Sequence, residues 1–106
     1  MKKIRVMFDF CSSGLWNMDD VKHGGMIEYE DLKLPKDLVK DMEAWIYSSD
    51  RCHSQKTFRL LAKNVNKVHK AGIALAKRIK ALHKDKKITY WGEGKNGKMI
   101  KEIEIT

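Results

Sequence analysis

Residues 58–82 read FRLLAKNVNKVHKAGIALAKRIKAL, and this stretch decides the architecture that we expect for the whole chain. Apolar residues recur in it at steps of three and four, which is the spacing of one face of an α-helix. They are Phe58, Leu61, Val65, Val68, Gly72, Leu75, Ile79 and Leu82. The pattern predicts one long amphipathic helix or two collinear helices. Gly72 costs a helix about 1 kcal/mol relative to alanine, so we expect close packing onto a sheet there.

Upstream of this stretch, the sequence predicts a strand, a long connection and a first helix. Residues 3–10 are rich in Ile, Val and Phe, which indicates an interior strand. Pro35 suits the first turn of a helix, and apolar residues follow it at helical spacing, so we expect a helix over residues 35–48. The connection of 24 residues between them, 11–34, is far longer than usual. A loop of that length is usually functional or mobile.

Downstream, the sequence predicts a hairpin that closes the fold. Residues 88–91 form a short strand, GEGKNG at 92–97 a turn, and apolar residues at 99–105 a last strand. A strand that returns to its sheet after helices lies parallel to its predecessor. We therefore expect a single α/β domain over residues 1–106, of order β-α-α-β-β, with a three-stranded mixed sheet packed against two helices.

Charge is unevenly distributed along the chain, whose formal net charge is +8. Residues 1–53 hold 8 basic and 10 acidic side chains, whereas residues 54–106 hold 14 basic and 4 acidic ones. Such asymmetry indicates a charged partner, either nucleic acid or an acidic protein. We find no secretory signal pattern and no apolar run of about 18 residues, so we expect a cytoplasmic protein without a membrane span.

Cys11 follows the first predicted strand within the sequence FDFCSSG. This stretch resembles the phosphate-carrying loop of the IIB components of sugar phosphotransferase systems, where a helix begins directly after the cysteine. Asn17 stands where the low-molecular-weight phosphatases need an arginine, and Asp19 and Asp20 would repel a phosphate. We therefore expect no catalytic residue and no enzyme activity. A phosphocysteine carrier that uses Cys11 stays an alternative.

Candidate metal ligands are few and badly spaced. Cys11, His23, Cys52 and His53 could meet only through the fold. Structural zinc sites use pairs of ligands two to four residues apart, and this chain has no such pair of pairs. We therefore expect two free thiols, no metal and no cofactor.

The second predicted helix carries a row of lysines opposite its apolar stripe. Its basic side chains stand three, four or seven residues apart without acids between them, a spacing that brings like charges together on a helix. We name four of them, Lys63, Lys67, Lys70 and Lys77, the lysine ridge. A solvated helix face usually mixes both signs, so the ridge is a candidate for binding an anionic partner. Arginine forks and stacking aromatics are missing from it, so nucleic-acid binding would be weak and sequence-blind; a non-specific nucleic-acid-binding module is the second alternative.

Several stretches together resemble one bacterial family. They are IRVMFDFCSSGLW, LPKDLVKDMEAWI, AGIALAKRIKAL and ITYW. The combination is similar to the immunity proteins of contact-dependent growth inhibition and related polymorphic toxin systems. The positions that carry the resemblance are Leu15, Trp16, Leu34, Pro35, Trp45, Gly72, Leu75 and Tyr90. Residues 50–64 look like an insertion that lengthens the second helix.

The resemblance implies an inhibitor that binds one cognate toxin domain, a nuclease, and performs no chemistry of its own. It leaves the oligomeric state open. The 11–34 connection is acidic and aromatic, and the predicted strands and helices account for the core without it, so its side chains should be free for a basic toxin cleft. The partner-binding candidates in this acidic segment are Trp16, Asp19, Asp20, Glu28, Tyr29, Glu30 and Asp31. We rank the acidic segment slightly above the lysine ridge.

Overall fold

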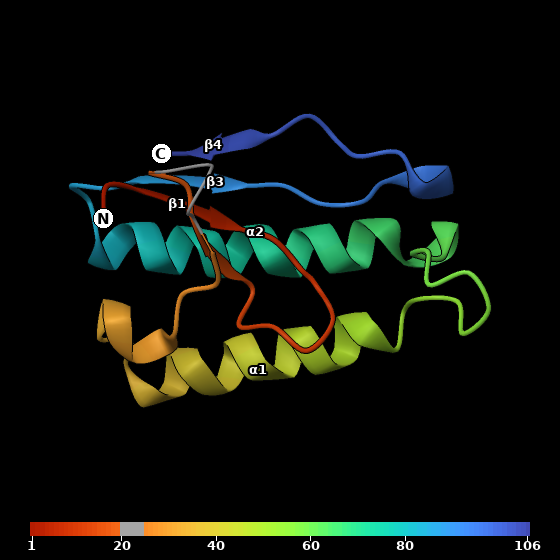
Figure 1. The fold of residues 1–106 in the computed structure, drawn as a ribbon, viewed down its shortest axis with the longest axis horizontal. Coiled ribbons are helices and arrows are strands. Elements are labelled where there is room, and N and C mark those ends of the chain that lie inside the picture. The colour runs from red at the N-terminus through yellow and green to blue at the C-terminus, as the bar shows by residue number, and fades with distance from the viewer. Residues whose placement is uncertain (20–24) are drawn as a thin grey trace.

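The computed structural model describes residues 1–19 and 25–106 of the chain. In Figure 1 a sheet, the helix α2 and the helix α1 follow one another from top to bottom. The strands are β1 (Lys3–Val6), β2 (Leu15–Asn17), β3 (Lys87–Tyr90) and β4 (Ile103–Ile105). The α-helices are α1 (Lys36–Asp50) and α2 (Val65–Leu82), and three short 3₁₀ helices are η1 (Tyr29–Leu32), η2 (Ala62–Asn64) and η3 (Lys95–Gly97).

The sheet confirms the α/β class and the predicted mixture of parallel and antiparallel pairs. Its spatial order is β2-β1-β3-β4, so β1 is an interior strand. β1 pairs with β3 in parallel, and β3 pairs with β4 antiparallel, as the crossover rule and the hairpin predicted. One sheet therefore contains strands from both the first and the second half of the chain.

The expectation of three strands was wrong, because the 11–34 connection contributes a fourth. β2 runs antiparallel to β1, with Leu15 opposite Val6, and the element order is therefore β-β-α-α-β-β. Gly14 precedes β2 at a φ of +79°, a backbone conformation that favours glycine and turns the chain back. A strand of three residues has no room for the alternation by which strands are recognised in a sequence.

The predicted helix over residues 35–48 is confirmed as α1, which ends slightly later. The second helix is shorter than predicted, because α2 begins at Val65 and residues 58–61 lie outside it. The segment from Cys52 to Leu61 instead folds back on itself, where the amide of Leu61 donates to the carbonyl of Cys52 at 3.1 Å. Residues 50–64 therefore do not lengthen the helix as the resemblance implied.

Gly72 of α2 packs closely against Tyr90 of β3 and Trp45 of α1, as its position in the apolar stripe predicted. A methyl group at this position would stand 2.4 Å from a ring carbon of Tyr90 and 2.6 Å from one of Trp45. The indole of Trp45 donates to the carbonyl of Val68 at 3.0 Å and so joins α1 to α2. His69 Nδ1 lies 2.7 Å from the Tyr90 hydroxyl, which joins α2 to the sheet.

Both cysteines are free thiols, of which Cys11 is exposed and Cys52 is buried. Within the described part of the chain, no helix has the length and apolar content needed to cross a membrane.

Candidate partner-binding site

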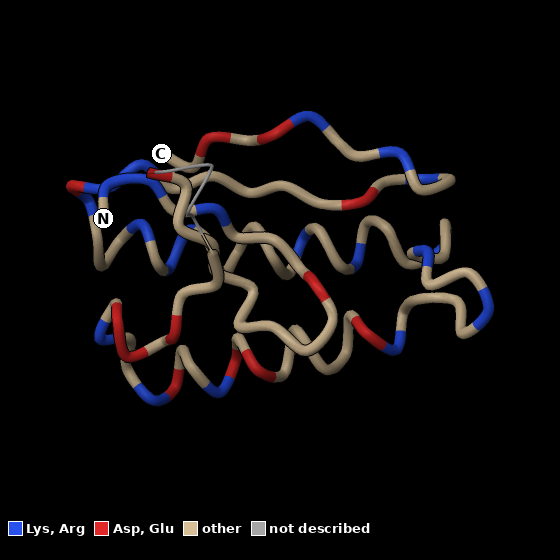
Figure 2. The backbone as a smooth tube through the Cα atoms, in the orientation of Figure 1, with Lys and Arg blue, Asp and Glu red and all other residues tan. Residues whose placement is uncertain are grey.

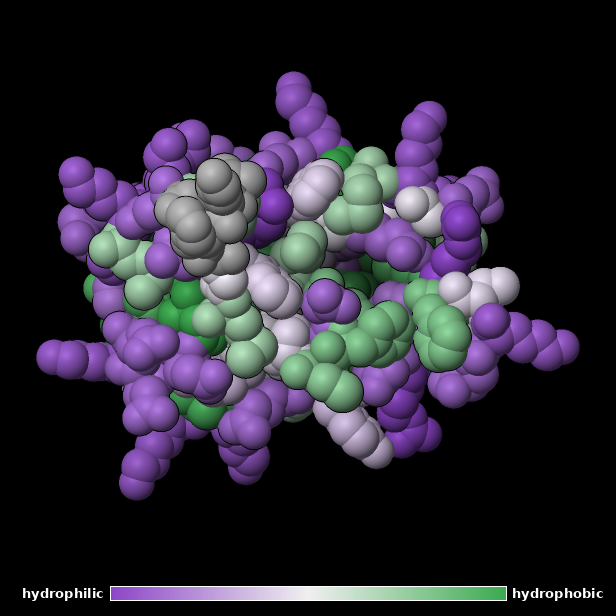
Figure 3. All heavy atoms as spheres, in the orientation of Figure 1, coloured by the Kyte–Doolittle hydropathy of each residue, from purple (hydrophilic) through white to green (hydrophobic). Residues whose placement is uncertain are grey.

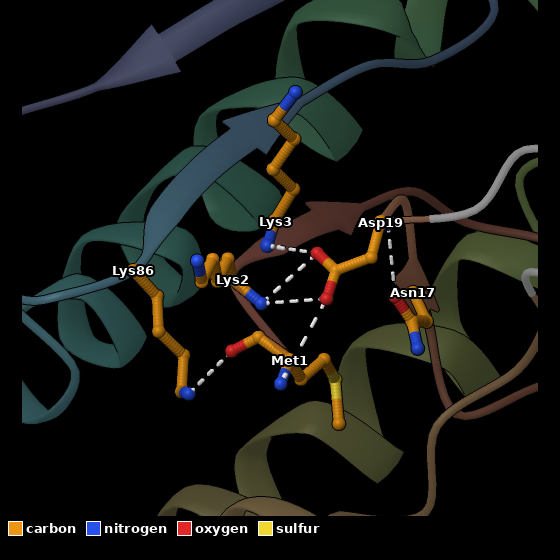
Figure 4. A network of polar contacts seen from close by, with 6 residues as sticks. All are labelled: Met1, Lys2, Lys3, Asn17, Asp19 and Lys86. Atoms are coloured by element: carbon orange, nitrogen blue, oxygen red, sulfur yellow. Dashed lines mark hydrogen bonds and ion pairs between the residues drawn. The ribbon is translucent and has the colours of Figure 1, made fainter.

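The side chain of Asp19 is used by the fold, although the sequence suggested a free contact residue. Its carboxylate accepts the amide of Lys3 at 2.6 Å and that of Lys2 at 2.9 Å, and it lies 3.8 Å from the N-terminal ammonium (Figure 4). The Lys2 and Lys3 amides hold the pKa of Asp19 below its usual value of 3.8. Asp19 therefore anchors the chain at the entrance to β1.

The two aromatic side chains of the acidic segment are also engaged within the chain. The indole of Trp16 donates to the carbonyl of Met7 at 2.9 Å, and the hydroxyl of Tyr29 donates to the carbonyl of Ser13 at 2.9 Å. Both residues are half-buried, and burial raises the pKa of Tyr29 to about 12. Each of these two side chains therefore already has a hydrogen-bond partner inside the chain.

The remaining acids of this segment surround η1. Asp31 accepts the amide of Glu28 at 3.0 Å, and the two residues form the capping box of this short helix. Glu28, Glu30 and Asp31 are all exposed. Asp20 lies outside the described residues. Ile27 and Leu32, between these acids, are each only 3% exposed. The core therefore includes this segment, and the expectation that it is complete without it was wrong.

The lysine ridge is placed as the sequence predicted, on the outside of the molecule. All four lysines are exposed, Lys63 on η2 and the others on α2. In the part of the chain that the structure describes, none of the four forms an ion pair. Arg78 of the same helix behaves differently, because it binds Asp41 at 2.6 Å and Asp37 at 3.3 Å and so ties α2 to α1.

An aromatic cluster that the sequence analysis missed lies at one end of the molecule. Phe8 stacks on His53 with ring centroids 4.8 Å apart, and Phe10 packs edge-on against the same imidazole at 5.0 Å. Phe58 meets Phe10 edge-on at 6.2 Å and is 65% exposed. The helical spacing of Phe58 had assigned it to the core stripe, and no local signal in the sequence corrects that assignment.

The surroundings of Cys11 differ from a phosphocysteine loop. Cys11 adopts a φ of +55°, and the chain then turns into β2, so no helix begins directly after it. The helix dipole that activates such a thiol therefore does not face Cys11.

His23 lies outside the described residues. Within residues 1–19 and 25–106, no three His, Cys, Asp or Glu side chains gather as a metal ion would require.

Comparison with known families gives one match. The family described as Serratia CdiI immunity protein-like matches residues 2–93, which run from β1 to the end of β3 and just beyond. No curated protein matches the chain.

Proposed function

The chain belongs to the Serratia CdiI immunity protein-like family, and from this premise we propose that it binds a cognate toxin domain and neutralises it. The supporting observation is the extent of the match, since residues 2–93 include both α-helices and three of the four strands. Inhibition of this kind is stoichiometric, and the protein needs no reaction of its own. The partner is a protein, and no cofactor takes part.

Between the two predicted contact surfaces, side-chain availability favours the lysine ridge. The carboxylates of Asp19 and Asp31 and the rings of Trp16 and Tyr29 already have partners inside the chain. The ridge ammonium groups are exposed and available to an acidic toxin surface. The side chains of Glu28 and Glu30 are also exposed, so the acidic segment is the competing contact surface.

The function is tested by protection and binding. The probe is the C-terminal domain of the large secreted protein that we expect the neighbouring upstream reading frame to encode. Co-expression with this chain should restore growth of cells that make the domain, and calorimetry should show a 1:1 complex. Cys11→Ser should protect as well as the wild type, because thiol chemistry has no part in inhibition. Growth arrest despite abundant folded protein, with no heat of binding, would refute the proposal.

A pair of charge reversals compares the two surfaces. Lys63→Glu with Lys70→Glu should weaken binding of the domain. Glu28→Lys with Glu30→Lys changes the net charge by the same magnitude in the opposite direction and should have little effect. Reversing a charge at an interface mainly lowers the association rate. The opposite pattern would restore the acidic segment to first place.

That the toxin is a nuclease stays a prediction. It is checked by incubating the domain with plasmid DNA and with transfer RNA, and then adding an equimolar amount of this chain.

A further inference from the structure

The aromatic cluster forms an exposed apolar patch, and Figure 3 shows hydrophobic residues gathered beside a hollow over the segment after β1 and the α1–α2 connection. Phe58 is 65% exposed and Met99 42%, and both line the same cavity. Phe10, from the segment after β1, packs between His53 and Phe58. Contiguous exposed apolar surface of this kind is typical of a binding site, whereas isolated exposed apolar residues are ordinary.

The loop that presents Phe58 is ordered by its own hydrogen bonds. Ser54 accepts the amides of Lys56 and Thr57 at 3.2 and 3.3 Å, and its carbonyl accepts the Phe58 amide at 2.9 Å. Two contacts fix the loop to the β3–β4 connection. The Glu93 carboxylate accepts the amide of Leu60, and the guanidinium of Arg59 donates to the carbonyl of Asn96 at 2.9 Å.

Phe58 itself has a backbone conformation that a large side chain rarely adopts. Its φ is +58°, in the left-handed region that is disfavoured for every residue with a Cβ. The ring gains little burial in return, since most of it stays in water. The turn that the Ser54 hydrogen bonds hold therefore presents the ring to solvent. Backbone strain is a recurrent feature of binding sites, where it holds a group ready for its partner.

Beside the patch lies a cavity of about 140 Å³ that the rings line. Phe8, Phe10 and Phe58 form its sides, and His69 and Tyr90 contribute from α2 and β3. Burial lowers the pKa of His69, so this imidazole is neutral near pH 7. An apolar cavity of about 150 Å³ holds one benzene ring. The cavity therefore has the size and polarity for one aromatic side chain.

The polypeptide around the patch is strongly basic. Residues 51–70 and 94–101, which frame it, contain nine lysines and arginines and no acid. Figure 2 shows these cations on the α1–α2 connection, on the first half of α2 and along the β3–β4 connection. The acids that line the patch and its neighbouring cleft are Asp9, Asp50 and Glu93, and the last is already bound to the Leu60 amide. The net charge of this region complements an acidic partner.

We propose that this end of the molecule is the docking surface for the toxin, which inserts one aromatic side chain from an acidic surface into the cavity beside Phe10 and Phe58. The inference rests on the proposed function and adds the place and the chemistry of the contact. The ridge lysines Lys63 and Lys67 extend the same basic surface. A buried aromatic anchor surrounded by weaker polar contacts is the usual distribution of binding energy in protein interfaces.

The anchor is tested with Phe58→Asn, which removes the ring and places at this position a residue that tolerates the left-handed conformation. The matched control is Leu82→Asn, since Leu82 is 52% exposed and ends α2 at the opposite end of the helix. By calorimetry with the toxin domain, Phe58→Asn should raise Kd about 30-fold or more, the range of an interface hot spot. Leu82→Asn should leave Kd unchanged. Circular dichroism should show both variants folded.

The charge complementarity between this basic region and an acidic toxin surface is tested separately by reversing Lys56, Lys95 and Lys98 to Glu. The control reverses Lys36, Lys40 and Lys84, which lie away from the patch, and so changes the net charge equally. Only the first variant should lose about tenfold in association rate at low salt, and the loss should shrink in high salt, as expected for electrostatic steering.

The outcomes separate the docking surface from the function. If the wild-type chain neither binds nor protects, the proposed function and this inference both fall. If the wild type binds and the Phe58 and lysine variants bind equally well, only the docking surface is refuted. If sedimentation shows a wild-type dimer that Phe58→Asn dissociates, the patch is occupied by a second copy and the toxin contact lies elsewhere.

Discussion

Two connecting segments of this chain use their aromatic side chains in opposite ways. The acidic segment, residues 11–34, places the indole of Trp16, the phenol of Tyr29 and the carboxylates of Asp19 and Asp31 in hydrogen bonds within the molecule. The segment from Cys52 to Leu61 has an ordered backbone but leaves the ring of Phe58 in water. The first segment builds the fold, whereas the second presents a surface.

The difference teaches that composition alone does not identify a contact surface. Acids mixed with aromatics make a good anchor for a basic cleft only when their side chains are free. Here the carboxylate of Asp19 satisfies backbone donors at the chain start, and Leu32 fills the core beside the exposed acids. A surface is better identified by apolar groups that the fold could have buried but did not.

The sharpest test of this contrast compares two leucines. Leu32 of the acidic segment is 3% exposed and Leu61 is 37% exposed. Leu32→Ala should lower the free energy of unfolding by about 2–5 kcal/mol, because it leaves a cavity in the core. Leu61→Ala should change it by about 0.5 kcal/mol. Urea denaturation followed by fluorescence measures both, and equal losses would show that the two segments do not differ.

A smaller effect is expected at Asp19, and it depends on pH. The pKa of this carboxyl is held below 3.8 in the folded state by the Lys2 and Lys3 amides, so its charged form favours folding. That contribution is complete above about pH 4 and is lost as the pH falls through the folded-state pKa. Asp19→Asn should therefore unfold at a lower temperature than the wild type at pH 6. The difference between the two unfolding temperatures should become smaller towards pH 2.

Asp19 is not the only carboxyl whose pKa is lowered. Asp19→Asn therefore removes only one of the contributions to stability that are lost in acid. Hydrogen bonds from Arg5 lower the pKa of Glu102, and this contribution remains in Asp19→Asn. The wild type and the variant should therefore both lose stability in acid, and the wild type more steeply. Parallel curves from pH 6 to pH 2 would mean that Asp19 does not anchor the N-terminus.

A small effect on stability is expected at Phe58. Phe58→Asn removes an exposed ring and places a residue that tolerates the left-handed conformation where that conformation costs most residues about 1–2 kcal/mol. We expect the free energy of unfolding to stay within about 1 kcal/mol of the wild type, with a shift towards greater stability. Thermal unfolding by circular dichroism measures it, and a loss comparable to that of Leu32→Ala would show that Phe58 belongs to the core.

Much of the framework could be predicted from the sequence, because the helix and strand patterns are periodic. The helix after Pro35, the parallel pairing of β1 with β3 and the close approach at Gly72 were all expected and found. The start of the second helix was predicted wrongly. Phe58 and Leu61 match the helical spacing, but the hydrogen bonds of Ser54 hold the backbone in a turn there.

Of the candidate site, exposure of the lysine ridge could be predicted, since charged side chains opposite an apolar stripe must face water. The internal hydrogen bonds of the acidic segment could not be predicted, because the Asp19 carboxylate accepts the amides of Lys2 and Lys3 across 16 or more residues of chain. The aromatic patch was missed for the same reason, since Phe10 and Phe58 meet only through the fold.

The sequence by itself therefore determined the fold class, the two main helices and the basic character of the second half of the chain. Each of these depends on residues close together along the chain, whose spacing decides which face is apolar and which is charged. The tertiary structure alone decided that β2 joins the sheet, that the acidic segment is part of the core, and that four rings meet at one end. Those outcomes depend on contacts between distant residues, and local spacing carries no information about such contacts.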